Sequence, residues 1–390
     1  MHKDILVLNA GSSTIKLALY PGGEAPERVL YRGEADGLGG KRGRLLIRDA
    51  SGEPVVDQPL DGGHEQALET MLHWLAADSG HDPGAVGHRV VHGGTRYMQP
   101  VRLTPAVIED LERLDGLAPL HQPHNLAPVR MLERQTPDLP QVACFDTAFH
   151  ASQPWEARRF ALPRHYTDAG IVRYGFHGLS YEYVSRYLCR NHPRLHAGRV
   201  LVAHLGNGAS MCALHHGHSI ATTMGFTALD GLPMGQRCGS LDPGVILYLM
   251  DHHGMDLREV EDLLYHRSGL LGMSGISHDM RTLLASDEGD AAEAIQVYCY
   301  RAAREAGSLA AALRGVDGVV FTGGVGQHAA AVRAAICERL DWLGVRLDQE
   351  RNDGHAGCIS ADDSIPVLVI ATDEERIIAE HTRRVVSAAA

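Results

Sequence analysis

A strand–turn–strand pattern that occurs once in each half of the 390-residue chain constrains the fold most. Residues 6–19 read LVLNAGSSTIKLAL, and residues 202–214 read VAHLGNGASMCAL. Each segment is an apolar run, a turn of small and polar residues, and a second apolar run. Backbone N–H groups in such turns bind phosphate oxygens, although a single Gly-rich hairpin is weak evidence because ordinary hairpins use the same residues. The repeated pattern predicts two related domains that each carry a phosphate-binding turn.

Between and after these hairpins, strand-like runs alternate with helical patterns, which predicts an α/β fold. A third Gly-rich segment, TGGVG at 322–326, follows a strand and is expected to form a loop against another part of a nucleotide. The expected strands are 4–8, 14–20, 29–34, 44–48, 53–57, 86–92, 141–144, 199–205, 211–214, 318–321 and 366–371. The expected helices are 64–77, 104–114, 180–190, 244–253, 256–265, 277–285, 290–313 and 374–386.

Composition excludes several classes of protein. The chain has 36 basic and 48 acidic residues, a net charge of −12, and no dense basic run, so a nucleic-acid binder is not expected. No stretch approaches the roughly 18 apolar residues of a membrane helix, and the N-terminal segment shows no signal-peptide pattern. The seven cysteines never form C-x-x-C, which indicates reduced thiols and a cytoplasmic location. Neither a P-loop nor a Rossmann fingerprint is present, which disfavours both classes.

Histidine and lysine are used unevenly. Among 24 histidines, the densest cluster is His215, His216 and His218. Its spacing matches no common metal motif, so we expect a polar turn between two strands. Lys16 is one of only three lysines and follows the first phosphate turn. We expect it to contact phosphate, the alternative being a strand lysine whose ammonium simply reaches solvent.

Ten ordered motifs resemble the acetate kinases of the acetokinase family, in the superfamily of sugar kinases, heat-shock chaperone ATPases and actin. They are VLNAGSSTIK (7–16), GHRVVHGG (87–94), APLHQPHN (118–125), FDTAFH (145–150), YGFHGLS (174–180), HLGNGAS (204–210), MGFTALDGLPMGQRCGSLDP (224–243), SGLLGMSGISHDMR (268–281), FTGGVG (321–326) and TDEER (372–376). The resemblance implies two duplicated actin-like ATPase domains of the ribonuclease H-like type that face an ATP cleft. It assigns residues 1–146 with 375–390 to the first domain and 147–374 to the second. It also implies reversible, Mg²⁺-dependent phosphoryl transfer from ATP to acetate, with Mn²⁺ as a possible substitute, a homodimer, and a role in acetyl-CoA biosynthesis.

The same resemblance assigns roles residue by residue. Transfer of a phosphoryl group to a carboxylate brings two anions together, so cations and hydrogen-bond donors are needed between them. The catalytic positions are Arg89, Asp146, His177 and Arg237. The acyl-binding positions are Arg89, Val91, Leu120, His121, Phe176 and Ala228. The nucleotide-binding positions are Asn9, Ser12, Lys16, His204, Leu205, Gly206, Asn207, Gly208, Asp279, Met280, Arg281, Gly324, Val325, Gly326, Gln327 and His328. The Mg²⁺ positions are Asn9 and Glu374.

Three departures from the family pattern bear on specificity. Gln327 and His328 stand where the family usually has Glu-Asn, which leaves the phosphoryl donor open. Ala228 replaces a proline near the acetyl pocket, so propionate or butyrate is an alternative acceptor. Tyr181 replaces a histidine, which we interpret as a structural change. A non-catalytic nucleotide sensor is the alternative from another class, and the retained catalytic residues argue against it.

Overall fold

The computed structural model describes residues 3–11, 14–23, 28–38, 43–118 and 121–388. Contacts between Cα atoms divide the chain into two compact units: a first unit of residues 1–149 with 373–390, and a second unit of residues 150–372. The expected domain boundaries, after residues 146 and 374, differ from these divisions by a few residues. Asp373 belongs to the first unit because it accepts hydrogen bonds from Tyr20 and Arg32. Residues 147–149 also lie in the first unit, where the Thr147 hydroxyl accepts a hydrogen bond from the Gly93 amide.

An eight-stranded sheet organises the first unit, in the order β5-β4-β3-β2-β1-β6-β8-β7. β1 pairs antiparallel with β2 and parallel with β6, and β6 pairs parallel with β8. The parallel pairing matters for function because it places the carboxyl ends of β1, β6 and β8 at one edge of the sheet. The strands are β1 (Asp4–Ala10), β2 (Ile15–Tyr20), β3 (Tyr31–Asp36), β4 (Gly43–Asp49), β5 (Pro54–Leu60), β6 (Pro83–Val90), β7 (Val101–Arg102) and β8 (Gln141–Phe145).

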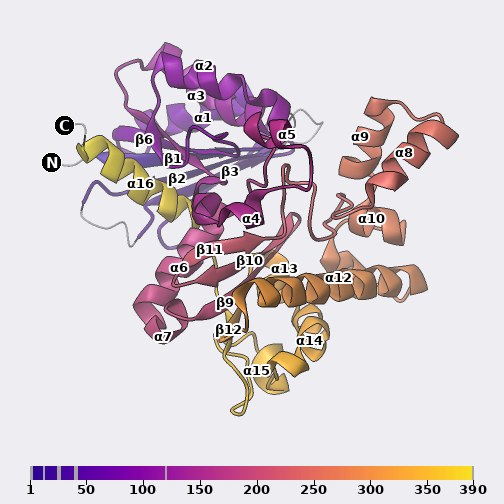
Figure 1. The fold of residues 1–390 in the computed structure, drawn as a ribbon. Coiled ribbons are helices and arrows are strands. Elements are labelled where there is room, and N and C mark those ends of the chain that lie inside the picture. The colour runs from indigo at the N-terminus through magenta and orange to yellow at the C-terminus, as the bar shows by residue number, and fades with distance from the viewer. Residues whose placement is uncertain (1–2, 12–13, 24–27, 39–42, 119–120, 389–390) are drawn as a thin grey trace. The chain divides into compact units, whose positions relative to one another are not determined.

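Four helices pack on this sheet or on one another: α1 (His64–Ala77), α2 (Pro105–Glu112), α3 (Gln122–Gln135) and α16 (Glu374–Ala388). α16, yellow in Figure 1, packs against β1, β6 and β8. The approach is close, since a Cβ atom on Gly87 of β6 would lie 2.2 Å from the Thr382 hydroxyl oxygen of α16. This packing fixes the first residue of α16, Glu374, beside the strand ends.

A five-stranded sheet organises the second unit, in the order β11-β10-β9-β12-β13. β9 pairs antiparallel with β10 and parallel with β12, which repeats the pairing pattern of β1 with β2 and β6. β10 and β11 flank a turn at His216, as expected for the histidine cluster. The strands are β9 (Arg199–Leu205), β10 (Ala209–His215), β11 (His218–Thr222), β12 (Gly318–Thr322) and β13 (Val367–Val369).

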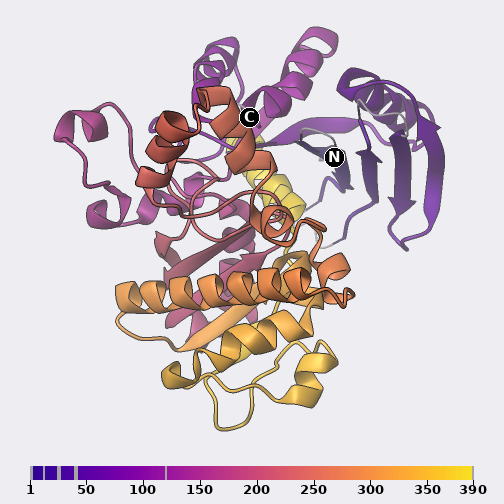
Figure 2. The ribbon, with the colours of Figure 1, turned by 90° about the vertical axis from the view of Figure 1, so that its right-hand side faces the viewer.

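The long helix α12 lies against β9, β10 and β11 of this sheet, as Figure 2 shows in orange. α6 and α13 contact β9. The helices of this unit are α4 (Trp155–Arg158), α5 (Arg164–Asp168), α6 (Gly178–Asn191), α7 (Pro193–His196), α8 (Pro243–His252), α9 (Leu257–His266), α10 (Gly269–Ser274), α11 (Met280–Leu284), α12 (Gly289–Leu313), α13 (Gly323–His328), α14 (Ala330–Glu338) and α15 (Gln349–Asp353). Short 3₁₀ helices lie at Asp115–Leu117, Ala148–Ser152 and Asp341–Leu343.

One expectation about local structure is wrong. The segment TGGVG was expected to be a loop, but residues 323–328 form α13 directly after β12. Gly323 makes this possible, because its φ is +77° and a Cβ atom there would lie 2.6 Å from the Leu205 carbonyl oxygen. A residue with a side chain would be strained at that junction.

Candidate active site

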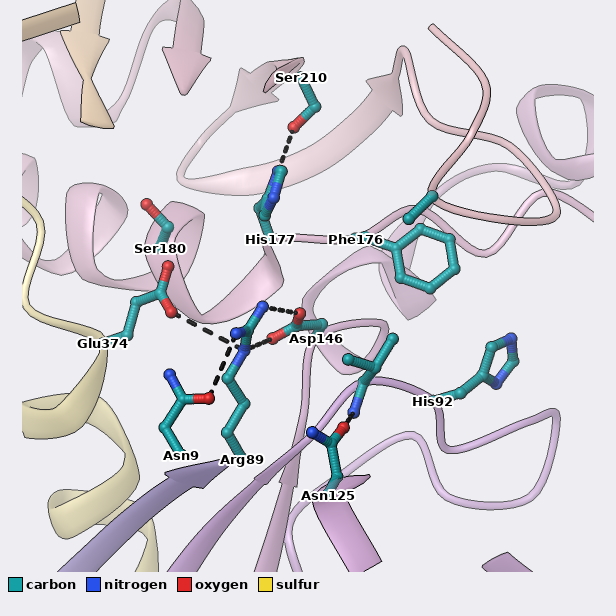
Figure 3. A network of polar contacts seen from close by, with 12 residues as sticks. Asn9, Arg89, His92, Asn125, Asp146, Phe176, His177, Ser180, Ser210 and Glu374 are labelled. Atoms are coloured by element: carbon teal, nitrogen blue, oxygen red, sulfur yellow. Dashed lines mark hydrogen bonds and ion pairs between the residues drawn. The ribbon is translucent and has the colours of Figure 1, made fainter. Parts of the chain in front are cut away.

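Three neighbouring strand ends of the first unit carry polar side chains. Asn9 lies near the end of β1, Arg89 near the end of β6, and Asp146 directly after β8. Parallel pairing brings these positions to the same edge of the sheet, and Glu374 joins them from the start of α16. The structure therefore gathers four of the residues that the sequence singled out (Figure 3).

Arg89 is the centre of this cluster. Its Nε and Nη2 donate to the two carboxylate oxygens of Asp146 at 3.0 and 2.6 Å. Its Nη1 donates to Oδ1 of Asn9 at 3.4 Å, and its Nε lies 3.9 Å from a Glu374 oxygen. Burial lowers the pKa of Arg89, but the neighbouring carboxylates outweigh this and raise it above its ordinary value. Since Asp146 occupies the edge of the guanidinium formed by Nε and Nη2, Nη1 with its long bond to Asn9 is the group available to a substrate oxygen.

The ionised form of Glu374 is disfavoured in this cluster. Burial raises its pKa to about 7, and although Arg89 lowers it, Asp146 and Glu375 add to the increase. Arg89 thus contacts both Asp146 and Glu374, while Glu375 pairs with Arg32 at 3.7 Å. Such a site fits a hard divalent cation, and the Asn9 amide oxygen and Glu374 carboxylate are ligands of the kind that Mg²⁺ uses. Among the described residues, no group of three or more His, Cys, Asp or Glu side chains is arranged to hold a metal ion.

Lys16 lies on β2 opposite Asn9 and is about half exposed. Its ammonium pairs with Glu34 of β3 at 3.7 Å, a solvent-screened contact that a phosphate could displace. Its charge also lowers the pKa of Glu374.

The helix α3, which the sequence did not predict, positions the segment after β6. The Asn125 side chain accepts from the Val91 amide at 2.9 Å and donates to the Ala10 carbonyl at 2.5 Å. The Gln122 side chain likewise accepts from the His92 amide and donates to the His92 carbonyl. A proline at the second helical position of APLHQPHN was the signal that could have located this helix.

The remaining first-unit candidates are placed as follows. Val91 is buried, and His121 is half-buried directly before α3. Ser12 of the first turn and Leu120 of the acyl pocket lie outside the described residues.

In the second unit, His177 occupies a backbone conformation that is uncommon for a side-chain-bearing residue. Its φ is +57°, and the residue directly precedes α6. Its Nδ1 lies 2.8 Å from the Ser210 hydroxyl oxygen, and its ring stacks on that of His204 at 4.4 Å. The left-handed conformation is uncommon for a residue with a side chain, and it sets the direction in which the imidazole leaves the backbone.

The second phosphate turn lies against this histidine. A Cβ atom on Gly208 would lie 3.2 Å from His177 Nε2 and 4.0 Å from Arg237 Nη1. Arg237 is held by the Ala228 carbonyl, which accepts from its Nη1 at 3.1 Å. The glycine therefore leaves room for an oxygen atom between an imidazole nitrogen, a guanidinium and a backbone turn, which is an arrangement suited to a phosphoryl group.

A pocket of about 590 Å³ continues from this turn and has the size of a nucleoside site. It is lined by Gly206, Asn207, Leu270, His278, Asp279, Met280, Arg281, Leu284, Gly324, Val325, His328 and Ala329. Eight of these were proposed from the sequence, whereas Leu270, His278, Leu284 and Ala329 were missed.

Five second-unit nucleotide candidates are not among the lining residues of that pocket. Leu205 and Gly326 are buried, Gly208 faces His177, and His204 stacks on His177. Gln327 is half-buried and its carbonyl accepts from Arg333. Of the second-unit acyl candidates, Phe176 is buried and Ala228 is half-buried.

The model of the acetokinase family matches residues 4–380. The chain belongs to the acetokinase family. Within this family, the acetate kinase of Rhodopseudomonas palustris strain CGA009 is 53% identical, with 98% of each chain covered. The acetate kinase of Rhizobium meliloti is 46% identical over 98% of each chain.

Solved structures of the acetokinase family share the fold. A propionate kinase from Francisella tularensis superposes with a TM-score of 0.91 at 35% identity, covering 98% of this chain and 99% of its own. The acetate kinase of Porphyromonas gingivalis gives a TM-score of 0.87 at 37% identity, covering 98% and 100%. The prediction of a duplicated actin-like α/β fold is thereby confirmed.

Proposed function

We propose that the chain catalyses reversible, magnesium-dependent phosphoryl transfer from ATP to acetate, giving acetyl phosphate and ADP. Its membership of the acetokinase family supports this, as do curated relatives named acetate kinase over nearly their whole length. The observation that carries the proposal is the bidentate Arg89–Asp146 pair, which fixes a half-buried guanidinium with one nitrogen left for an anionic acceptor.

In the proposed reaction, an acetate oxygen attacks the γ-phosphorus while the bond to the β–γ bridging oxygen breaks. No proton has to be transferred, so catalysis depends on positioning and on charge. Arg89 binds the acetate carboxylate, and Arg237 and His177 Nε2 donate to the transferring phosphoryl oxygens. Asn9 and Glu374 hold Mg²⁺, which supplies neutralisation of the phosphate charge. Val91 and His121 of the first unit and Phe176 of the second are the residues that we assign to the acetate methyl group.

Propionate is the second candidate acceptor, favoured by the structural likeness to a propionate kinase and by Ala228. Loss of the proline ring beside the carbonyl that holds Arg237 would widen the acyl pocket, which is worth about 1–3 kcal/mol per methylene. Trapping the acyl phosphate as a hydroxamate, with acetate, propionate and butyrate in parallel, tests both candidates. We expect product with acetate; product with none of the acids would contradict the kinase proposal and favour a nucleotide sensor.

We propose ATP as the donor, bound by the nucleoside pocket of the second unit. His328 lines this pocket in place of the usual asparagine, while Gln327 does not line it, so His328 is the departure with the larger effect on nucleotide preference. The hydroxamate assay with ATP, GTP, inosine triphosphate and pyrophosphate tests this. Equal rates with all four donors would contradict a nucleoside-reading role.

We propose that the chain forms a homodimer through α8. None of the residues of this helix is buried, although it is strongly apolar: Leu247 is 68% exposed and Tyr248 53%. An apolar face of this kind indicates a protein contact, and a second copy is the partner that the family resemblance implies. We further propose a cytoplasmic location, supported by seven cysteines that form no C-x-x-C motif. No described helix is both long and apolar enough to cross a membrane.

A further inference from the structure

Three buried or half-buried side chains, His177, Ser210 and Tyr181, form a chain of hydrogen bonds. Nδ1 of His177 lies 2.8 Å from the Ser210 hydroxyl oxygen, and that oxygen lies 2.5 Å from the Tyr181 hydroxyl oxygen. Tyr181 and Ser210 are both fully buried. Tyr181 lies in the first turn of α6, four residues after His177, which directly precedes the helix.

Counting protons along this chain leaves one satisfied arrangement. Among the described residues, the Tyr181 hydroxyl has one hydrogen-bond partner, Ser210, so its proton must be donated there or remain unpaired in the core. If Tyr181 donates to Ser210, the Ser210 proton is directed to His177 Nδ1, which must then accept. In the reverse order, His177 Nδ1–H donates to Ser210, Ser210 donates to Tyr181, and the buried phenol proton has no acceptor, which is strongly disfavoured.

The surroundings keep the phenol in its donating form. Burial raises the pKa of Tyr181 well above its ordinary value. The neighbouring His150 ring does not offer an alternative acceptor, because it meets the Tyr181 ring edge-on at 5.6 Å while its Nδ1 and Nε2 are bonded to Ser219 and the Phe176 carbonyl.

We propose that Tyr181, acting through Ser210, holds neutral His177 in the tautomer that carries its proton on Nε2. Nε2 is the nitrogen that faces Gly208 and the phosphate turn. On the proposed function, on which this inference rests, His177 then donates a hydrogen bond to the transferring phosphoryl group without becoming an imidazolium. A neutral donor suits this position because the Arg237 guanidinium faces the same glycine, and a second cation beside it would be repelled. Tyr181 and Ser210 are therefore positioning residues, and the replacement of a histidine by Tyr181 is more than a structural change.

The tautomer can be read directly in the wild-type protein. Histidine labelled with ¹⁵N in the ring distinguishes the two neutral tautomers and the imidazolium, and the His177 signals are assigned by their loss in His177→Gln. At pH 8 we expect a protonated Nε2 and an unprotonated Nδ1. A proton on Nδ1, alone or together with Nε2, overturns the proposal. This measurement needs no turnover, so its failure is distinct from an absence of kinase activity in the hydroxamate assay.

A matched pair of variants tests the role of the hydroxyl. Tyr181→Phe removes the donor to Ser210, and Tyr298→Phe removes another buried phenol hydroxyl that has no partner. We expect Tyr181→Phe to lower kcat about 3- to 10-fold, as for the loss of one hydrogen bond, with KM values within about two-fold and with a population of the Nδ1–H tautomer. Tyr298→Phe should keep the wild-type kcat and spectrum. Equal kcat values for the two variants, or a loss in Tyr181→Phe with an unchanged His177 spectrum, overturn the proposal.

Discussion

At the scale of single residues, Arg89 and Arg237 are each fixed by a neighbour rather than by the substrate. Asp146 holds Arg89 through two bonds, and the Ala228 carbonyl holds Arg237. Preorganised donors of this kind need no rearrangement when charge develops in the transition state. We therefore assign to these two guanidiniums the positive charge that the proposed phosphoryl transfer requires.

We therefore expect Arg89→Ala and Arg237→Ala each to lower kcat by at least about 100-fold, the scale for losing one such donor. The hydroxamate assay under saturating substrate measures this. Arg130→Ala is the control, because Arg130 of α3 also forms a half-buried bidentate pair, with Glu112, but is none of the assigned active-site residues. Near-normal turnover in either active-site variant would contradict the assigned mechanism.

His88 gives the first unit a sensitivity to acid. It is buried on β6, with Nε2 bonded to the Gln141 side chain, and burial lowers its pKa to about 4 from 6.5. Between these values the unfolded chain binds the proton and the folded chain does not. The contribution of His88 to the free energy of unfolding is therefore fully present above pH 6.5. It is lost as the pH falls toward 4, by about 3 kcal/mol.

Urea unfolding at pH values from 7 to 4 measures that loss. His88→Gln should flatten the pH dependence by about the same amount, whereas His73→Gln, on the exposed face of α1, should leave it unchanged. An equally steep acid loss in His88→Gln would show that other groups cause it.

At the scale of elements, the hairpin between β9 and β10 depends on Gly208 having no side chain. A methyl group on Gly208 would stand 3.2 Å from His177 Nε2, in the space that we assign to a phosphoryl oxygen. We expect Gly208→Ala to lower kcat at least about 10-fold while the unfolding midpoint changes little. Gly289→Ala, at the open start of α12, is the control and should change neither. A Gly208→Ala enzyme with normal kcat would place the phosphoryl group elsewhere.

Elements with regular apolar spacing were predictable, and those governed by Gly and Pro were not. α1, β9 and α12 were expected within a residue of their observed bounds. α3 was missed because its interior contains Pro128, and α13 because a Gly-rich segment reads as a loop. The residues of the candidate site likewise fall into predictable and unpredictable groups. Motif residues such as Arg89 and Asp146 were identified, but Asn125 and Leu270 act through tertiary placement that no local pattern encodes.

At the scale of the whole molecule, the exposed face of α8 predicts association. We expect Leu247→Glu to shift the proposed dimer toward monomer at micromolar concentration, because a charge would be buried in an apolar contact. Sedimentation velocity measures the change. Val55→Glu, which alters an exposed apolar residue on β5, should leave the mass unchanged. A dimer that persists in Leu247→Glu would contradict the role given to α8.

The first unit is built from two separate segments of the chain, and α16 comes from the second of them. During synthesis, β1, β6 and β8 leave the ribosome long before the helix that packs on them, with the whole second unit translated in between. Until then Gly87 and its neighbours lack their cover, and the cluster around Arg89 lacks Glu374. Catalytic competence is therefore a late event in the life of the chain, and a product of translation that stops before α16 would carry most of the fold without the full charge arrangement of the site.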